Sequence, residues 1–236
     1  MMKKFLFIVL VSVFTLLITS QVTANPGSTV YDEIVWHEGK EHKRFFKSEA
    51  LLKLHAMELG IKTEGKDMES LTKEVHEGII IRKANELGIE SEGRDLQELG
   101  KEVHQMMVMK KADTLGINIE GKDFKTITKE VKEAKIKKMA ARLGIKTDGK
   151  DMKKLRKEVM ETYLRSEAEK LGILTAGKDQ EQLKQEIQRA KILKAADKLG
   201  VEVKNKDSEQ LLDEIITNHL EKAKELNVYP FDHSMK

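Results

Sequence analysis

A basic residue followed directly by an aspartate is the combination in this chain that is best placed to do chemistry. The pair recurs six times at one constant spacing along the chain. A cation beside the first turn of a helix, where backbone N–H groups are unpaired, could bind an anion. The aspartate could instead accept those N–H groups itself, as a helix N-cap. We therefore expect a partner-binding or polyanion-binding surface at the six basic residues Lys66, Arg94, Lys122, Lys150, Lys178 and Lys206.

A glutamate recurs at a fixed distance after each of these cations. General acid–base catalysis or a metal site would need a second carboxylate or a histidine at the same place, and none recurs. Calcium binding by the Gly-Lys-Asp loops is disfavoured because they lack alternating oxygen ligands. We interpret the glutamates as partners of the loop cations or as solvated residues: Glu74, Glu102, Glu130, Glu158, Glu186 and Glu214.

Candidate sites outside the repeat are few. His37 and His42, flanked by Glu38 and Glu41, form the densest group of potential metal ligands, with a charged leader segment as the alternative. Trp36 is either a ligand-stacking residue or part of a terminal cap. The chain has no cysteine and no Gly-x-Ser-x-Gly motif that would supply a nucleophile. We expect no enzymatic activity, no cofactor and no bound metal.

Two further groups of residues are expected to be structural. His76 and His104 occupy equivalent places in consecutive repeats, which we interpret as a surface position. Met106, Met107 and Met109 could form an adaptable binding surface, but filling between helical units is favoured.

Local start and stop signals divide the repeat region into helices. Each aspartate of a basic-Asp pair can cap a helix that begins just after it. At Asp95, Asp179 and Asp207 a Glu or Gln three positions later completes a capping box. Each helix then ends at a Leu-Gly pair whose glycine suits the left-handed C′ position. The predicted caps are Asp67, Asp95, Asp123, Asp151, Asp179 and Asp207 at the starts and Gly60, Gly88, Gly116, Gly144, Gly172 and Gly200 at the ends.

The apolar residues of each helix fall into two groups on nearly opposite faces. Ile127 and Val131 lie four positions apart, but Ile136 follows after five and begins the second group. Such a helix can be shared, with its second half packing across the next loop onto the following helix. The members of the first four expected cores are, in chain order, Leu52, Ala56, Leu59, Ile61, Met68, Leu71, Val75; Ile80, Ala84, Leu87, Ile89, Leu96, Leu99, Val103; Val108, Ala112, Leu115, Ile117, Phe124, Ile127, Val131; and Ile136, Ala140, Leu143, Ile145, Met152, Leu155, Val159.

This pattern predicts an all-α fold. Six helix–loop–helix modules, each of about 28 residues, would share helices across positions 47–219 as a tandem array. The spacing leaves open an extended zigzag, if the helices are straight, and a compact solenoid, if they kink.

The two ends of the chain differ from the repeat. Residues 1–24 combine two lysines, an apolar run and small residues before Asn25, as in a secretory signal peptide that is either cleaved or kept as an anchor. Residues 25–46 are expected to be an N-terminal capping segment, and residues 220–236 a partial seventh module and cap. We expect a protein that is secreted or held at the cell surface, with no membrane contact after signal cleavage.

Charge is nearly balanced once the leader is set aside. Of the 43 lysines and arginines, Lys3 and Lys4 lie in the leader, which leaves 41 basic against 40 acidic residues. A nucleic-acid-binding domain usually has a strongly basic pI and a basic stripe. The mixed charges are typical of a solvated helical surface and weigh against a dedicated polyanion-binding face.

The repeated unit resembles the helix–extended loop–helix module of the SAP, LEM and Rho N-terminal type. It is also similar to repeats in secreted proteins of spore-forming bacilli that have no assigned activity. In the module family, many members bind DNA or RNA through the loop and the start of the second helix, while the LEM type binds protein. The resemblance implies such a role for the basic loop residues; it extends over the whole repeat region and is carried by Ala56, Leu59, Gly60, Ile61, Gly65, Lys66, Leu71, Val75 and their later equivalents.

Two functions are therefore expected from the sequence. The first is a secreted, non-enzymatic helical repeat protein that acts as a multivalent binding or structural component at the bacterial surface, with a protein or a cell-wall polymer as partner. The alternative is an extracellular protein that binds nucleic acid or another anionic polymer through the loop lysines. The oligomeric state is left open.

Overall fold

The computed structural model describes residues 48–232, and within them the protein is all-α. The predicted signal segment at 1–24 and capping segment at 25–46 lie outside the described residues, as do Trp36, His37 and His42. The described helices are α2 (Glu49–Glu58), α3 (Met68–Leu87), α4 (Leu96–Thr114), α5 (Phe124–Arg142), α6 (Met152–Lys170), α7 (Gln180–Leu199), α8 (Ser208–Asn218) and α9 (Leu220–Glu225).

Helices α3 to α8 each begin just after the aspartate of a basic-Asp pair, because that carboxylate accepts a free N–H group of the first turn. At α5, the backbone N–H of Thr126 donates to Asp123 at 2.7 Å. Among the three expected capping boxes, both reciprocal bonds form at Asp179 and Asp207. At Asp95, the bond found in the described region is the one from the N–H of Glu98.

The shared helices end in the predicted glycine motif. At the end of α5 the N–H of Ile145 donates to the carbonyl of Ala140 at 2.9 Å, and Gly144 has a φ of 70°. All six predicted C′ glycines have φ between 67° and 74°, where a side chain would be strained. Helix α3 continues unbroken through Gly78. A Cβ there would lie 3.1 Å from the side chain of Leu59, so the glycine makes room for the preceding loop.

The buried side chains form five clusters, and most of them join two helices across the intervening loop. The third and fourth expected cores are found as separate clusters, each with Leu and Ile of the loop packed against its buried residues. The first two expected cores instead form one continuous cluster, so the described residues do not divide into six separate cores. Met68, expected in the first core, is 39% exposed because it stands at the outer rim as the first residue of α3.

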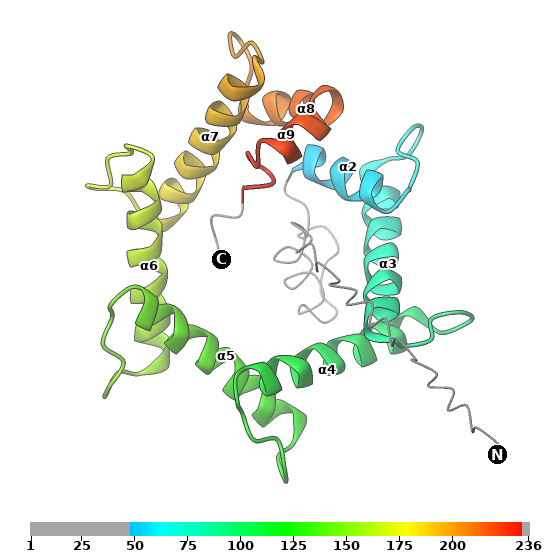
Figure 1. Ribbon diagram of the computed structural model, residues 1–236, viewed down its shortest axis with the longest axis vertical. Coiled ribbons are helices and arrows are strands. Elements are labelled where there is room, and N and C mark those ends of the chain that lie inside the picture. Colours follow the sequence, from blue (N-terminus) through cyan, green and yellow to red (C-terminus); the bar gives the residue numbers. More distant parts are fainter. Residues whose placement is uncertain (1–47, 233–236) are drawn as a thin grey trace, which may run out of the picture.

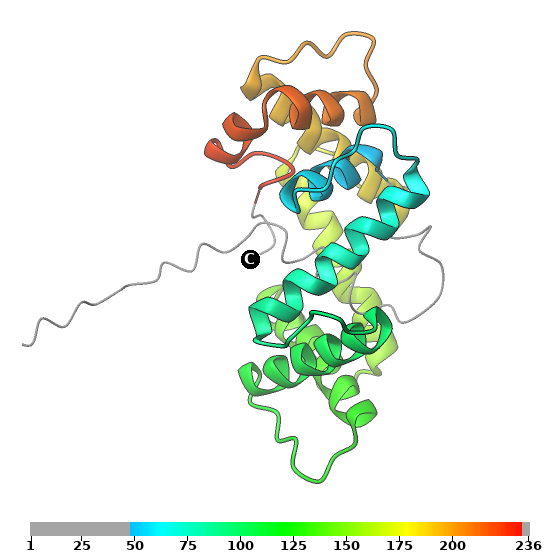
Figure 2. The ribbon, with the colours of Figure 1, turned by 90° about the vertical axis from the view of Figure 1, so that its right-hand side faces the viewer.

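The first described helix and the last helix of the repeat region close the array. Helix α2 packs against α8, and Figure 1 shows the helices following one another around a closed ring with the loops projecting outward. Figure 2 shows the same ring from the side. Helix α3, in teal, runs obliquely from the loop after α2 toward α4. The sequence left an extended zigzag and a solenoid open. The structure has neither form, because α2 is in contact with the other end of the repeat region.

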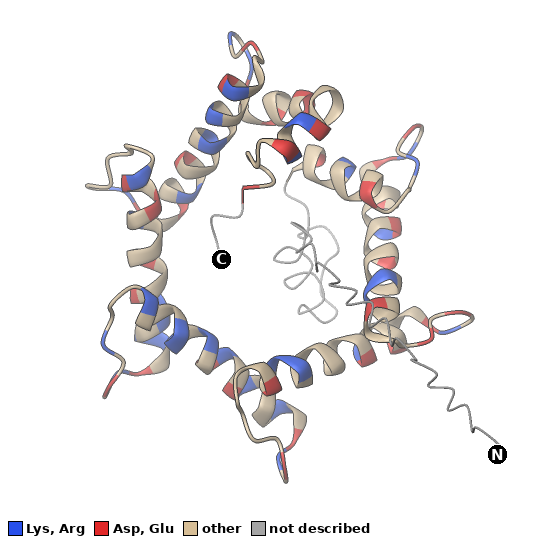
Figure 3. Ribbon diagram, viewed as in Figure 1, with Lys and Arg blue, Asp and Glu red and all other residues tan. Residues whose placement is uncertain are grey.

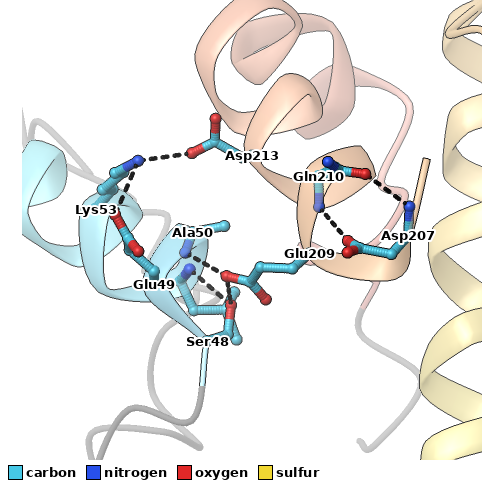
Figure 4. A network of polar contacts seen from close by, with 9 residues as sticks. Ser48, Glu49, Ala50, Lys53, Asp207, Glu209, Gln210 and Asp213 are labelled. Carbon is cyan, nitrogen blue, oxygen red and sulfur yellow. Dashed lines mark hydrogen bonds and ion pairs between the residues drawn. The ribbon is translucent and has the colours of Figure 1, made fainter. Parts of the chain in front are cut away.

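Polar contacts hold the closing joint, as Figure 4 shows. Glu209 of α8 accepts hydrogen bonds from the hydroxyl of Ser48 at 3.0 Å and from the backbone N–H of Ala50 at 2.8 Å. A carboxylate from α8 therefore caps the N-terminus of α2. Beside it, Lys53 donates to Asp213 at 3.0 Å, and this hydrogen bond is the main cause that raises the pKa of Lys53.

An apolar cluster drawn from both ends of the described chain lies at this joint. It includes Ala50 and Leu54 of α2, which pack with residues of α7 and α8. After α9, Val228 and Phe231 are buried in the same cluster. Its remaining buried members are Ile192, Ala195, Ala196, Leu199, Val201, Leu211, Leu212, Ile215, Ile216 and Ala223.

One expected surface residue is buried. His104 is only 8% exposed, and its ring meets that of Phe124 edge to face with centroids 5.5 Å apart. The interpretation of His104 as a surface position is wrong, because α5 begins against this side of α4. Of the three methionines, Met107 and Met109 pack against clusters, while Met106 is 38% exposed.

Candidate functional site

The six basic loop residues occupy one repeated geometry, which is clearest at the loop before α5. Lys122 donates to the carboxylate of Glu130 at 2.7 Å, and the adjacent Asp123 caps the helix. The backbone N–H of Thr126, donating to Asp123, is the main cause that lowers the pKa of that carboxyl. Both members of the ion pair are about one-third exposed. Each loop therefore presents, at the surface of the ring, one cation that contacts a glutamate and is followed directly by the capping aspartate; we call this the loop surface.

The same pairing is present at every copy. The recurring glutamates had two interpretations from the sequence, pairing or solvation, and the structure has them paired. The paired residues are Lys66–Glu74, Arg94–Glu102, Lys122–Glu130, Lys150–Glu158, Lys178–Glu186 and Lys206–Glu214.

This arrangement has consequences for anion binding. The helix N-terminus, which could attract a phosphate, already donates to an aspartate, and the cation beside it already contacts a glutamate. An incoming polyanion would have to displace a carboxylate or remain next to two of them. Partly exposed ion pairs of this kind contribute no more than about 1 kcal/mol to stability, so they leave the loop surface free to exchange partners.

Charge is distributed less evenly than the chain totals indicate. Residues 122–157 carry 14 lysines and arginines against five acids. Figure 3 shows the resulting concentration of basic residues along α5 and the start of α6. The charge total of the whole chain does not show this region. A sliding count along the sequence would have found it.

Acidic and histidine side chains do not gather into a metal site in the described part of the chain. Across residues 48–232 there is no group of three or more His, Asp or Glu residues able to hold an ion. The expected candidate around His37 and His42 lies outside these residues. Among the described helices, none combines the length and the hydropathy of a membrane-crossing segment.

Comparison with known proteins gives no relative: no family model, no characterised protein and no solved structure matches this chain.

Proposed function

We propose that this is an exported, non-enzymatic helical repeat protein that binds its partner through the repeated loop surface. In this proposal six modules share helices around the ring and present six similar contacts. Weak contacts at several places on one molecule add up through effective concentration when the partner is also repetitive. The observation that carries the proposal is the identical cation–carboxylate pairing at all six loops.

The chemistry of the loop surface favours one kind of partner. Each loop presents both signs of charge within a few ångströms, as in the contact of Lys122 with Glu130 at 2.7 Å. A partner that itself carries both signs, such as a protein or a peptide-bearing cell-wall polymer, can pair with both. A pure polyanion such as nucleic acid would meet two carboxylates at each cation. The pairing therefore supports the first function expected from the sequence over the alternative.

A binding assay on purified bacterial cell walls tests this proposal. The loop variant carries Arg94→Gln, Lys122→Gln and Lys150→Gln. The matched control carries Lys101→Gln, Lys129→Gln and Lys157→Gln, which removes the same charge from exposed, repeat-equivalent places on the helices that follow these loops. Neither variant removes a buried side chain, so we expect both to keep the helical signal of the parent chain in circular dichroism.

The expected result separates multivalent from single-site binding. The single change Lys122→Gln should weaken binding to walls about threefold, and the loop variant should lose roughly the product of three such factors. The helix control should bind within about twofold of the parent chain. The proposal is overturned if the parent chain does not bind walls, or if the two triple variants weaken binding equally.

A further inference from the structure

A pocket lined by lysines opens between three consecutive helices. Its volume is about 200 Å³, and it lies between the C-terminal halves of α3 and α4 and the middle of α5. Lys83, Lys110, Lys111 and Lys135 contribute side chains to its wall. None of the described residues that line it is acidic. Outside the wall, Glu86 lies 2.9 Å from Lys83.

The repeat shows that this concentration of charge is not required by the fold. Lys111 on α4 and Lys135 on α5 occupy the places that Glu167 on α6 and Lys191 on α7 occupy two repeats later. There the two side chains form an ion pair at 3.8 Å, and Asp232 lies 3.1 Å from the same lysine. The scaffold therefore accepts opposite charges at these two places. Between α4 and α5 both places are lysines, Lys111 and Lys135.

The repeat that lies between these two along the chain has no charged residue at the equivalent places. Met139 on α5 and Tyr163 on α6 occupy them, and burial, with the charges of Glu167 and Asp232, raises the pKa of Tyr163 to about 12. A second pocket, between α6 and α7, is lined by equal numbers of cations and acids. Neither of these two places has the excess of lysines that is present in the pocket between α3, α4 and α5.

Position in the helices does not explain all four lysines. A helix C-terminus favours cations, and Lys111 lies in the last turn of α4. Lys135 lies in the middle of α5, where the helix dipole has no such effect. Leu87 and Met107 form the apolar part of the wall.

We propose that this pocket binds one compact anion that carries two or more adjacent phosphate groups. The lysine ammonium group is a compact point charge that can donate to phosphate oxygens from several directions, whereas arginine donates in one plane. The pocket is smaller than the roughly 300–1,000 Å³ of sites for drug-sized molecules, so it fits a phosphate chain better than a whole nucleotide. The pocket does not involve the loop surface, so the inference is independent of the proposed function.

Calorimetric titration with inorganic tripolyphosphate tests the site on the full chain. At low salt we expect one bound ligand per chain, with affinity falling as salt is raised because the charges are screened. Lys111→Gln should weaken binding about tenfold, the usual effect of losing one charged hydrogen bond. Lys111→Arg should restore it to within a fewfold. A matched control is available because Lys194 on α7 occupies the repeat position of Lys110 and is exposed.

The comparison of these variants decides the outcome. Lys110→Gln should weaken binding several-fold, and Lys194→Gln should leave it unchanged. A stoichiometry near six would place binding at the loops and overturn the inference, as would equal effects of Lys110→Gln and Lys194→Gln or the absence of any binding at low salt. A parallel titration with a short poly(glycerol phosphate) chain identifies the source of the phosphate. Whichever ligand binds tighter through Lys111 is the better candidate.

Discussion

The joint that closes the ring and the joints between consecutive helices are built differently. Between α5 and α6, only Ala140, Leu155 and Val159 are fully buried, and the backbone bond from Ile145 to Ala140 fixes the turn. Between α2 and α8, Ala50 and Leu54 of α2 join an apolar cluster that α7, α8 and the residues from α9 onward also build, and side-chain hydrogen bonds are added. Ser48 and Glu209, which meet there, are 161 positions apart.

This difference follows from chain entropy. Consecutive helices are held near each other by a short loop, so few buried side chains suffice to fix their packing. The two ends of the ring have no such tether and must be held by contacts alone. Changes at the closing joint should therefore alter the shape and stability of the whole ring, while changes at a consecutive joint should act locally.

The largest effect is expected from the apolar part of the closing joint. Leu54→Ala removes a nearly fully buried side chain of α2 from that cluster and should destabilise the protein by about 2–5 kcal/mol. Urea unfolding followed by circular dichroism measures the change. Leu226→Ala, at a leucine that is 43% exposed, is the control and should stay within about 0.5 kcal/mol. Equal effects of the two changes would contradict the role of Leu54 in closure.

A smaller effect is expected from the carboxylate that caps α2. Glu209→Ala removes the acceptor for Ser48 and for the N–H of Ala50 and should cost about 1–3 kcal/mol. Glu214→Ala is the control with the same change of residue. It breaks the loop ion pair with Lys206 and should cost no more than about 1 kcal/mol. The same unfolding measurement compares them, and a larger cost at Glu214 would reverse the comparison.

At a consecutive joint, the backbone of the glycine stop should set the cost. Gly144→Ala should destabilise by about 1–2 kcal/mol, because a residue with a side chain is strained at a φ of 70°. No neighbouring atom lies within 4 Å of the added methyl group, so the cost comes from the backbone alone. Gly100→Ala, inside α4 with only an ordinary contact at 3.4 Å, should be stabilising by up to about 1 kcal/mol. Thermal melts of both variants give the sign. A neutral result at Gly144 would mean that the helix does not need a left-handed residue there.

The smallest effect concerns pH. The pKa of Asp123 is lower in the folded chain than in the unfolded chain, mainly because the Thr126 N–H donates to its carboxylate. Its contribution to stability is thus complete above the ordinary aspartate pKa and is lost as pH falls through the lowered value. Asp123→Asn should flatten part of the acid limb of a stability–pH curve. An unchanged acid limb would show that this cap is not linked to protonation.

Much of the local structure could be predicted from the sequence, because its determinants are only a few residues apart. The aspartate starts, the glycine stops and the split of Ile127 and Val131 from Ile136 are all set within single helices and loops. The all-α fold and the members of the third and fourth cores were predicted from these signals.

Ring closure could not be predicted in this way. It depends on the sum of all the angles between successive helices, and no short stretch of sequence encodes that sum. The contact of Glu209 with Ser48 has no local signal at either residue. The lysine pocket was missed for a related reason, since Lys83, Lys111 and Lys135 lie on three helices and become neighbours only when those helices pack.

The measurement that tests ring closure most directly is zero-length cross-linking with a carbodiimide, which joins a lysine to a carboxylate only when the two are in contact. Lys53 and Asp213 lie 3.0 Å apart across the closing joint. Mass spectrometry of the monomeric fraction should find the peptide that joins them, and Asp213→Asn should abolish it. The local pair Lys122–Glu130, at 2.7 Å, serves as the positive control. If the local link forms in monomers and the link between Lys53 and Asp213 does not, the ring is not closed.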